Sequence, residues 1–458
     1  MRRVVHACLV VYLAVALAAG PAGARALSRA EERKLGERVL AQVRREFRVL
    51  DDPYLTRYLR EVGGRVARGM PDLAFEPRFH LVLDSRVNAF AVPGGHVFVT
   101  SQTVLACQDE SELAGVLAHE VAHVAARHIA HRVEKAAKVN LGALAAVLAS
   151  VFLGSPKAGA ALGTFALAGA QAKMLQYSRE DEEDADRRAV RALVKAGYDP
   201  WGIVRFMETI RRQSPVPDGV PAYLFTHPLP ANREAYLAAM IDGRPPDRPS
   251  GPPEGLWRAQ ARVLVAESRD AGEALFRQRT REHPESPSAW LGLALLVREA
   301  GRYDEALEVL ARAEKLAPDD PEILHEKAAT WLRQGRREDA LALLERLRRS
   351  GRAPLPALQD LAWAYLEADQ PEKALAVYDE IARAAPDWGK LAYYRGLALG
   401  RAGRTGEGHE LLGDYYRSAG RLDLAARHYR LAVKALPEGE RREAVRRKLR
   451  ALGASPGR

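Results

Sequence analysis

Two histidines four residues apart, with a glutamate directly after the first, lie in VLAHEVAHVAARH, residues 116–128. Residues i and i+4 of an α-helix lie on one face, so His119 and His123 can present two imidazole nitrogens to a single ion. Zinc suits this pair because it binds nitrogen ligands and has no geometric preference of its own. Glu120 lies one step round the helix, where its carboxylate can take a proton from a zinc-bound water. This spacing predicts a peptidase site, but a bare HExxH also occurs by chance and needs support from the rest of the chain.

The helix that carries this pattern has clear start signals. Asp109 and Glu112 have the spacing of a capping box, in which two side chains bond the first free backbone N–H groups. Leu113, Val116 and Leu117 then supply an apolar stripe. We therefore expect a helix that begins near residue 109.

A third ligand is expected from the acidic segment QYSREDEEDADRRAVRALVKAG, residues 176–197. Ser178 can cap a helix that ends at Gly197. Several acidic residues compete there, but Glu182 and Asp186 share one face with apolar residues further along. A carboxylate on an inward face needs a partner, because an unpaired buried charge is costly. We assign Glu182 to the metal and Asp186 to a contact that orients a ligand histidine.

Three segments of the chain resemble the zinc metalloprotease family that includes HtpX and the CAAX prenyl endopeptidases. They are NAFAVPGGHVFVTSQTV (88–104), ESELAGVLAHEVAHVAARH (110–128) and YSREDEEDAD (177–186). The resemblance implies a zincin-like domain with one zinc ion per chain, and it also places the third ligand at Glu182 and an aspartate at Asp186. Ala189 stands where the family usually has glycine, which exchanges one small residue for another.

The resemblance also implies how a substrate binds. The strand around Phe90 to Val99 should lie beside the cleft and pair with an extended substrate backbone. The substrate-binding residues expected from this segment are Asn88, Phe90, Pro93, Gly94 and Gly95.

The segment FTHPLPANRE, residues 225–234, lies over the metal by the same resemblance. His227 is then either a fourth ligand that closes the site at rest or a donor to the oxyanion during catalysis. Arg233 either anchors the loop or contacts substrate. The remaining histidines nearby are expected to be structural or exposed, because in a continuous helix His128 would lie about 140° from His123. They are His96, His128 and His131.

The order of patterns predicts a mostly α fold with a small β-sheet. Residues 28–79 and 109–241 have helical apolar spacing, while FHLVLDS and GHVFVTS alternate as half-buried strands do. GRPPDRPSGPPEG, residues 243–255, has the composition of an extended linker. We therefore expect a metalloprotease domain over 27–242 and a second domain over 256–458.

The second domain repeats with a period of 34 residues. Ala306, Ala340 and Ala374 recur at this interval, and the turns before them lie at Gly301, Gly335, Asp369 and Gly403. This is the pattern of tetratricopeptide repeat (TPR) helix pairs, and it predicts an α-solenoid of about five units. Such stacks form a curved surface that binds peptides or proteins.

The first 26 residues have the pattern of a secretory signal. Arg2 and Arg3 precede an apolar run, and small residues before Leu27 offer cleavage sites. An uncleaved membrane anchor is the alternative. Cys107 alone remains after cleavage, so no internal disulfide is expected. The net charge of +10 is spread along helices, which does not favour nucleic-acid binding.

These patterns together predict a periplasmic zinc endopeptidase with a TPR docking module. The resemblance implies that it degrades or helps assemble misfolded outer-membrane proteins, with the β-barrel assembly machinery as a partner of the TPR groove. The apolar segment 139–172 is expected either to pack as a hairpin or to contact lipid at the membrane surface. The rival hypothesis is a TPR chaperone or scaffold whose metal site stays closed.

Overall fold

The computed structural model of the chain divides into two compact units, Met1–Val263 and Leu264–Arg458. The leader, the apolar segment 139–172, most of the linker and most of the loop around His227 lie outside the described residues. Within the described part, no helix is long and apolar enough to cross a membrane. The structure describes residues 26–71, 73–135, 177–213, 227, 233–241, 243, 251–386 and 388–453.

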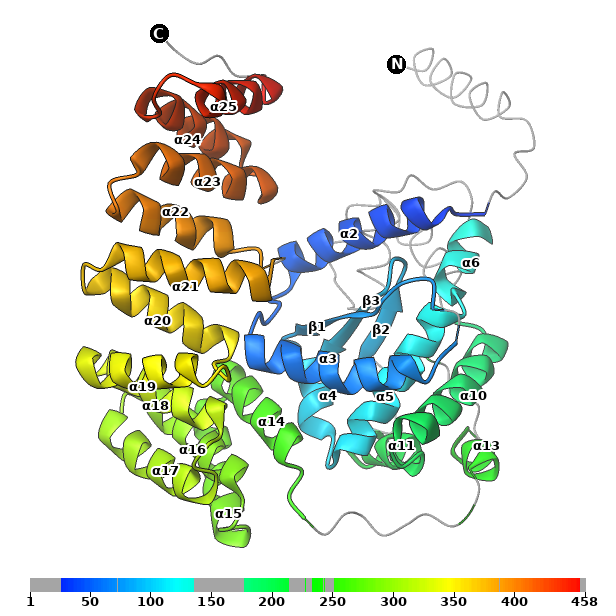
Figure 1. Ribbon diagram of the computed structural model, residues 1–458. Helices are drawn as coiled ribbons and strands as arrows, with labels where there is room; N and C mark the ends of the chain where they lie inside the picture. Colours follow the sequence, from blue (N-terminus) through cyan, green and yellow to red (C-terminus); the bar gives the residue numbers. More distant parts are fainter. Residues whose placement is uncertain are drawn as a thin grey trace, which may run out of the picture. The chain divides into compact units, whose positions relative to one another are not determined.

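The first unit combines helices with one small sheet (Figure 1). Its elements are α2 (Arg29–Glu46), α3 (Pro53–Arg68), β1 (Arg78–Val82), β2 (Ala89–Val92), β3 (His96–Thr100), α4 (Ser101–Ala106), α5 (Glu110–Ala125), α6 (His128–Lys135), α10 (Arg179–Ala196), α11 (Trp201–Gln213), α13 (Arg233–Met240) and α14 (Glu254–Glu267).

The sheet has the strand order β1-β3-β2, with β3 parallel to β1 and antiparallel to β2. The two strands predicted from alternation are β1 and β3. The segment expected to form a strand around Phe90 to Val99 contains a turn at Pro93–Gly95, which separates β2 from β3. Gly94 and Gly95 adopt φ of 84° and 86° there, which residues with a side chain rarely adopt. Both edges of β3 are paired, so of these two strands β2 is the one that can offer an edge to another strand.

Helix α5 forms the centre of the first unit and is buried along almost its whole length. It packs against β2, α3, α10 and α11, and Figure 1 shows it between the sheet and the helices α10 and α11. As predicted, its start is capped: the side chain of Asp109 accepts a hydrogen bond from the Glu112 N–H at 2.9 Å. Close packing also needs Gly115, since a Cβ there would lie 2.9 Å from the backbone of Ile203.

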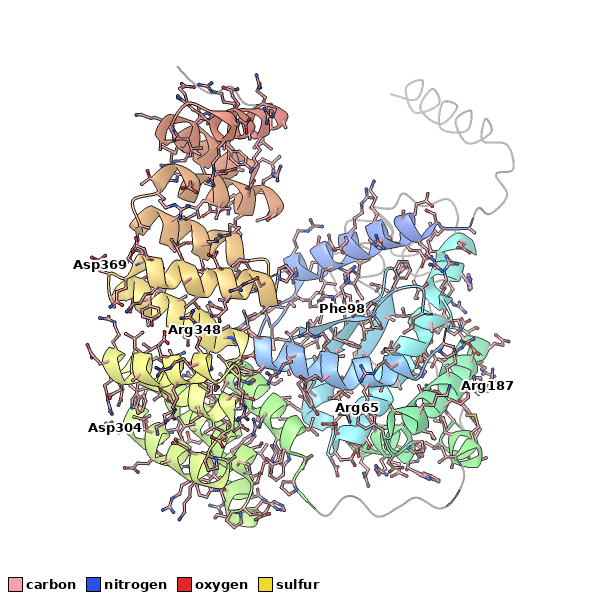
Figure 2. All side chains as sticks on the ribbon, in the orientation of Figure 1. Arg65, Phe98, Arg187, Asp304, Arg348 and Asp369 are labelled. Atoms are coloured by element: carbon pink, nitrogen blue, oxygen red, sulfur yellow. The ribbon has the colours of Figure 1, made fainter. Side chains whose placement is uncertain are left out.

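A second apolar cluster lies between α2 and the sheet. Leu35 and Val39 of α2 pack with Phe90 and Phe98, whose rings stack at 4.9 Å (Figure 2 labels Phe98). A capping box formed by Ser28 and Glu31 begins α2. This cluster fixes the face of the sheet that is turned toward α2.

The boundary between the two units falls inside α14, further along the chain than the linker at which we expected the domains to part. Leu256, Ala259 and Val263 of α14 belong to the core of the first unit. The Gln260 amide also donates to the carbonyl oxygens of Val104 (3.0 Å) and Cys107 (2.9 Å). The first ten residues of this helix therefore pack with the protease-like unit.

The second unit is a stack of helices in chain order (Figure 1). Its helices are α15 (Arg269–Glu282), α16 (Pro287–Glu299), α17 (Tyr303–Leu316), α18 (Pro321–Arg333), α19 (Arg337–Arg349), α20 (Leu355–Glu367), α21 (Pro371–Ala384), α22 (Leu391–Arg401), α23 (Thr405–Ser418), α24 (Leu422–Ala435) and α25 (Glu440–Ala451).

The repeat residues have the positions that the 34-residue period predicts. Ala306, Ala340 and Ala374 are fully buried, which lets neighbouring helices approach closely. The turn glycines all have positive φ, and Asp369, labelled in Figure 2, adopts a φ of 56° at the corresponding turn. Aspartate takes this conformation more readily than most residues, so the turn is kept without glycine.

Two histidines meet on the sheet. Nε2 of His80 on β1 lies 2.9 Å from Nδ1 of His96 on β3, and the His80 ring stacks on Phe98 at 5.0 Å. Burial, the neighbouring His96 and nearby arginines lower the pKa of His80 to about 3. Burial and Arg78 lower the pKa of His96 to about 4, against the opposing effect of Glu37. Both imidazoles are therefore neutral at physiological pH.

Acid is expected to destabilise the first unit through His80. Its pKa lies below the 6.5 of an unperturbed histidine, so between pH 6.5 and about 3 the unfolded chain binds a proton that the folded chain does not. The free energy of unfolding should fall as the pH drops through this range, by about 1.4 kcal/mol per pH unit for this group. Urea unfolding of the wild type and His80→Phe at several pH values measures it. The variant should show the smaller slope, and parallel curves would contradict the assignment.

Candidate metal centre

Three histidines and one glutamate converge beside α5. One ligand atom from each of His119, His123, Glu182 and His227 lies within 4.8 Å of the others, and all four side chains are buried. The structure thus brings together the three residues assigned to the metal and the histidine expected over it. Two of these residues come from α5 and one from α10.

Helix α10 presents its acidic face as the sequence predicts. Ser178 and Asp181 form a capping box that begins the helix, and Gly197 ends it with a φ of 74°. Glu182 and Asp186 are both fully buried on the side that faces α5. The acidic residues on the other side of α10 stay exposed or half-buried, so helical periodicity alone separates the two groups.

Each ligand histidine of α5 directs Nε2 toward the centre and Nδ1 away from it. Nε2 of His119 lies 3.3 Å from a Glu182 oxygen, and Nε2 of His123 lies 3.5 Å from the other. The outer nitrogen of His119 lies 2.9 Å from Asp186, which is the contact expected for that aspartate. The outer nitrogen of His123 lies 2.9 Å from Nδ1 of His128.

The donor set fits a zinc ion. Nε2 of His119 and Nε2 of His123 face each other at 3.1 Å. When the outer nitrogen of each ring carries the proton, both inner nitrogens present lone pairs to the same point, and a cation resolves this repulsion. Nitrogen donors with one carboxylate are the ligands that zinc takes in catalytic sites. The four residues would hold one such ion.

Glu120 lies beside this cluster without a hydrogen-bond donor. Within the described residues, neither of its carboxylate oxygens accepts a hydrogen bond, although the side chain is fully buried. One oxygen lies 3.3 Å from Nε2 of His227. Burial raises the pKa of Glu120, so the carboxylate is a stronger base than in water. A buried acceptor in this position is suited to taking a proton from a water molecule.

A buried arginine holds the acidic side of the cluster. Arg233 begins α13 and is only 1% exposed. Its Nε and Nη2 donate to the two oxygens of Asp186 at 2.8 and 2.6 Å, and Nη1 lies 3.0 Å from Glu182. Tyr236 donates a further hydrogen bond to Asp186. Of the two roles expected for Arg233, this geometry supports the anchor.

The charges of the cluster stabilise one another. Burial opposes ionisation of Glu182, but His227 and Arg233 hold its pKa well below the usual range. Burial also opposes charge on His119, yet Glu182 and Asp186 raise the pKa of that imidazole to about 9, so zinc binding would displace the proton from its inner nitrogen. The carboxylates are thus ionised and ready to face a cation.

The residues expected to bind substrate have different surroundings. Pro93, Gly94 and Gly95 line a cleft that also includes His123 and Ile129. Phe90 instead packs fully buried against Phe98 under α2, so its side chain belongs to the core of the unit and does not line the cleft. Asn88 lies just before β2, and its backbone N–H donates to the hydroxyls of Thr100 and Thr103.

Sequence reasoning missed two residues of the site. Tyr177 stacks on the His123 ring at 3.7 Å and on the His227 ring at 5.1 Å. It stands directly before the Ser178 cap, but nothing in its local pattern indicated a contact with the metal centre. His128 is the other, and the expectation that it lies away from His123 is wrong. The helix ends at Ala125, and Arg127 turns the chain with a φ of 53°.

Comparison with known families agrees with this geometry. The model of peptidase family M48 matches residues 53–241, which contain every ligand described above. Residues 53–241 are an M48 peptidase domain. Tetratricopeptide repeat models match residues 259–321, 297–358 and 331–398, so the M48 domain is followed by TPR repeats. Zinc is the metal of M48 peptidases, in agreement with the ligand set.

Several curated relatives are similar to part of the chain. The beta-barrel assembly-enhancing protease of Yersinia pestis is 31% identical over 297 residues, covering 64% of this chain and 61% of that protein. The protein of that name from Escherichia coli K12 is 30% identical over 299 residues, with the same coverage. Mitochondrial metalloendopeptidase OMA1 of Schizosaccharomyces pombe is 32% identical over 180 residues, covering 39% of this chain and 50% of that protein. The chain spans about three fifths of the length of the first two relatives.

Proposed function

We propose that this chain is an exported zinc metalloendopeptidase that is latent at rest and docks its substrates or partners through its TPR unit. The observation that carries the proposal is Glu120, a fully buried carboxylate without a hydrogen-bond donor in the described structure, next to three histidines and Glu182. A metal site that only stabilises the fold has no use for such a base.

The catalytic roles follow from the contacts. When bound, zinc supplies Lewis-acid chemistry, which polarises a carbonyl group and acidifies water. Glu120 accepts the proton of the attacking water and can return it to the leaving amine. Asp186 orients His119 through its outer nitrogen, and Arg233 holds Asp186 and Glu182 in place. These residues keep the ligands aligned while the substrate is cleaved.

The edge of β2 supports the proposal of a latent state. An extended substrate would bond to backbone groups of this strand. Nε2 of His227 lies 3.3 Å from the carbonyl oxygen of Ala89, and the Tyr177 hydroxyl donates to that of Ala91 at 3.3 Å. His227 also lies 2.9 Å from Glu182 and 3.3 Å from Glu120. His227 therefore takes a ligand position at the metal site and also contacts the Ala89 carbonyl oxygen, a backbone acceptor that the substrate needs.

Replacing His227 by alanine is expected to raise peptidase activity. If the closed arrangement is held by at least nine molecules in ten, releasing it raises kcat/KM for a casein-derived peptide at least about tenfold. The matched control is His131→Ala, because His131 is an exposed histidine on α6 and should leave the rate unchanged. A fall in activity on removing His227 would exclude the closing role and support the oxyanion role instead.

For the biological role, we propose quality control or assembly of outer-membrane proteins in the periplasm. The support is the printed name of the Yersinia pestis and Escherichia coli relatives, together with the basic and apolar leader pattern. The substrates are then misfolded or misassembled polypeptides, and the TPR unit contacts the β-barrel assembly machinery. Cell fractionation with intact-mass measurement tests the export: a periplasmic chain that begins at Leu27 is expected, and a cytoplasmic full-length chain would refute it.

A TPR scaffold with a permanently closed metal site is the second candidate function. His227 favours it, since a fourth protein ligand leaves no position for substrate. The buried carboxylate of Glu120, which accepts no hydrogen bond within the described residues, speaks against it. Casein cleavage separates the two candidates, because a scaffold stays inactive as the wild type and as His227→Ala.

A further inference from the structure

The ligand His123 has an outer nitrogen that needs a hydrogen-bond acceptor. Its inner nitrogen, Nε2, faces Glu182 and His119, so the proton of the neutral ring must lie on Nδ1 if the ring is to bind a metal. Nδ1 of His128 is 2.9 Å away, and the two rings meet edge to face at 5.1 Å. Metal-bound histidines usually donate this proton to a carboxylate, a backbone carbonyl or water. Here the neighbouring side chain is another imidazole.

The far side of His128 fixes which of its nitrogens carries the proton. Its Nε2 lies 3.5 Å from Asp184 and 3.9 Å from Asp181, both on α10. These carboxylates attract the N–H of the His128 ring to Nε2. Nδ1 is then left with a lone pair that accepts the proton of His123. The chain Asp184–His128–His123 therefore links α10, which supplies Glu182, to the second ligand of α5.

The backbone between the two histidines is shaped for this contact. In a continuous helix the two side chains would point about 140° apart. Arg127 breaks the helix with a φ of 53°, a conformation that is uncommon for a residue with a side chain. Its Nε donates to the buried Glu32 of α2 at 2.9 Å, and its Nη2 donates to the Leu27 carbonyl at 3.0 Å. These contacts hold the turn that brings His128 back to His123.

We propose that His128 is a positioning residue for the M48 metal centre: it accepts the outer proton of His123 and so directs the inner nitrogen toward the ion. The inference rests on the proposed zinc site but not on proteolysis. It assigns His128 the role toward His123 that Asp186 has toward His119. The two ligand histidines of α5 are thus oriented by different chemistry, one by a carboxylate and one by a neutral imidazole backed by carboxylates.

The test compares two substitutions of His128 by their affinity for zinc. Asparagine places an amide oxygen at the δ position and keeps an acceptor for His123, whereas leucine keeps the bulk and removes it. We expect His128→Leu to weaken zinc binding roughly 10- to 100-fold and His128→Asn to stay within about threefold of the wild type. Competition with a fluorescent zinc chelator measures the affinity, and the melting temperature in EDTA reports the folding of the metal-free chain. His131→Leu, an exposed histidine of the same helix, is the matched control.

Two results would overturn the proposal. Wild-type zinc affinity in His128→Leu would show that the contact is dispensable, and an equal loss in His128→Asn would show that the ring matters only for packing. Should the leucine variant fail to fold, His128→Gln replaces it, because glutamine places its amide at the ε position and cannot accept from His123 in the same way. Glutamine should then bind zinc less tightly than asparagine, and equal affinities would refute the role. A chain that binds zinc as expected but cleaves no peptide would refute only the proposed function.

Discussion

Glutamine in place of Glu120 is expected to lower kcat by roughly 10²–10⁴-fold while zinc content stays at the wild-type level. Glutamine has nearly the same shape but cannot take a proton from water. The Glu120 carboxylate lies beside the ligand cluster but is not one of its four ligands, so the ion should remain bound when it is replaced. Casein cleavage and metal content of the purified chains are the two measurements.

Glu183→Gln is a matched control for this substitution. Glu183 lies on the exposed side of α10, where it pairs with Arg187 at 3.7 Å and both side chains are about half exposed. Its loss should leave kcat unchanged. If Glu120→Gln cleaved casein at the wild-type rate, Glu120 would not be the base, and the structural metal site would become the better account of the cluster.

The metal ligands could be predicted from the sequence because their information is local. The four-residue step from His119 to His123 places both on one helix face wherever the helix lies. The same periodicity separated Glu182 and Asp186 from the other acidic residues of α10, and all four are buried at the centre. The sequence near the helix does not tell which histidine of a distant loop lies at the metal site. His227 was expected there only through the family resemblance.

The turn at Arg127 could not be predicted because a distant contact holds it. No glycine or proline stands beside Arg127 to predict a turn. Its left-handed conformation depends on Glu32, 95 residues earlier. Hydrophobic alternation likewise missed β2, in which every residue from Ala89 to Val92 is buried, so no period of two remains. The proline-rich linker predicted a domain boundary, but it gave no sign that the start of α14 joins the core of the first unit.

Removal of the buried guanidinium should have the largest effect on stability. Arg233→Met is expected to lower the unfolding free energy of the metal-free chain by about 3–5 kcal/mol, because Asp186 and Glu182 are left as buried charges without their cation. Burial opposes ionisation of Asp186, and it is chiefly Arg233 that holds the pKa of this carboxyl below its usual range. Arg233→Lys should recover only part of the loss, since one ammonium group cannot bond both oxygens of Asp186 and Glu182 together. Urea unfolding in EDTA measures each variant.

A double substitution separates the lost ion pair from lost packing. Adding Asp186→Leu to Arg233→Met removes the uncompensated charge, so the double variant should be more stable than the sum of the single losses predicts. Arg187→Met, on the exposed face of α10 and labelled in Figure 2, should change stability by no more than about 0.5 kcal/mol, because its pair with Glu183 lies in water. Strictly additive losses at Arg233 and Asp186 would mean that the two side chains do not act as a pair. The anchoring of His119 and Glu182 through Arg233 would then have to be abandoned.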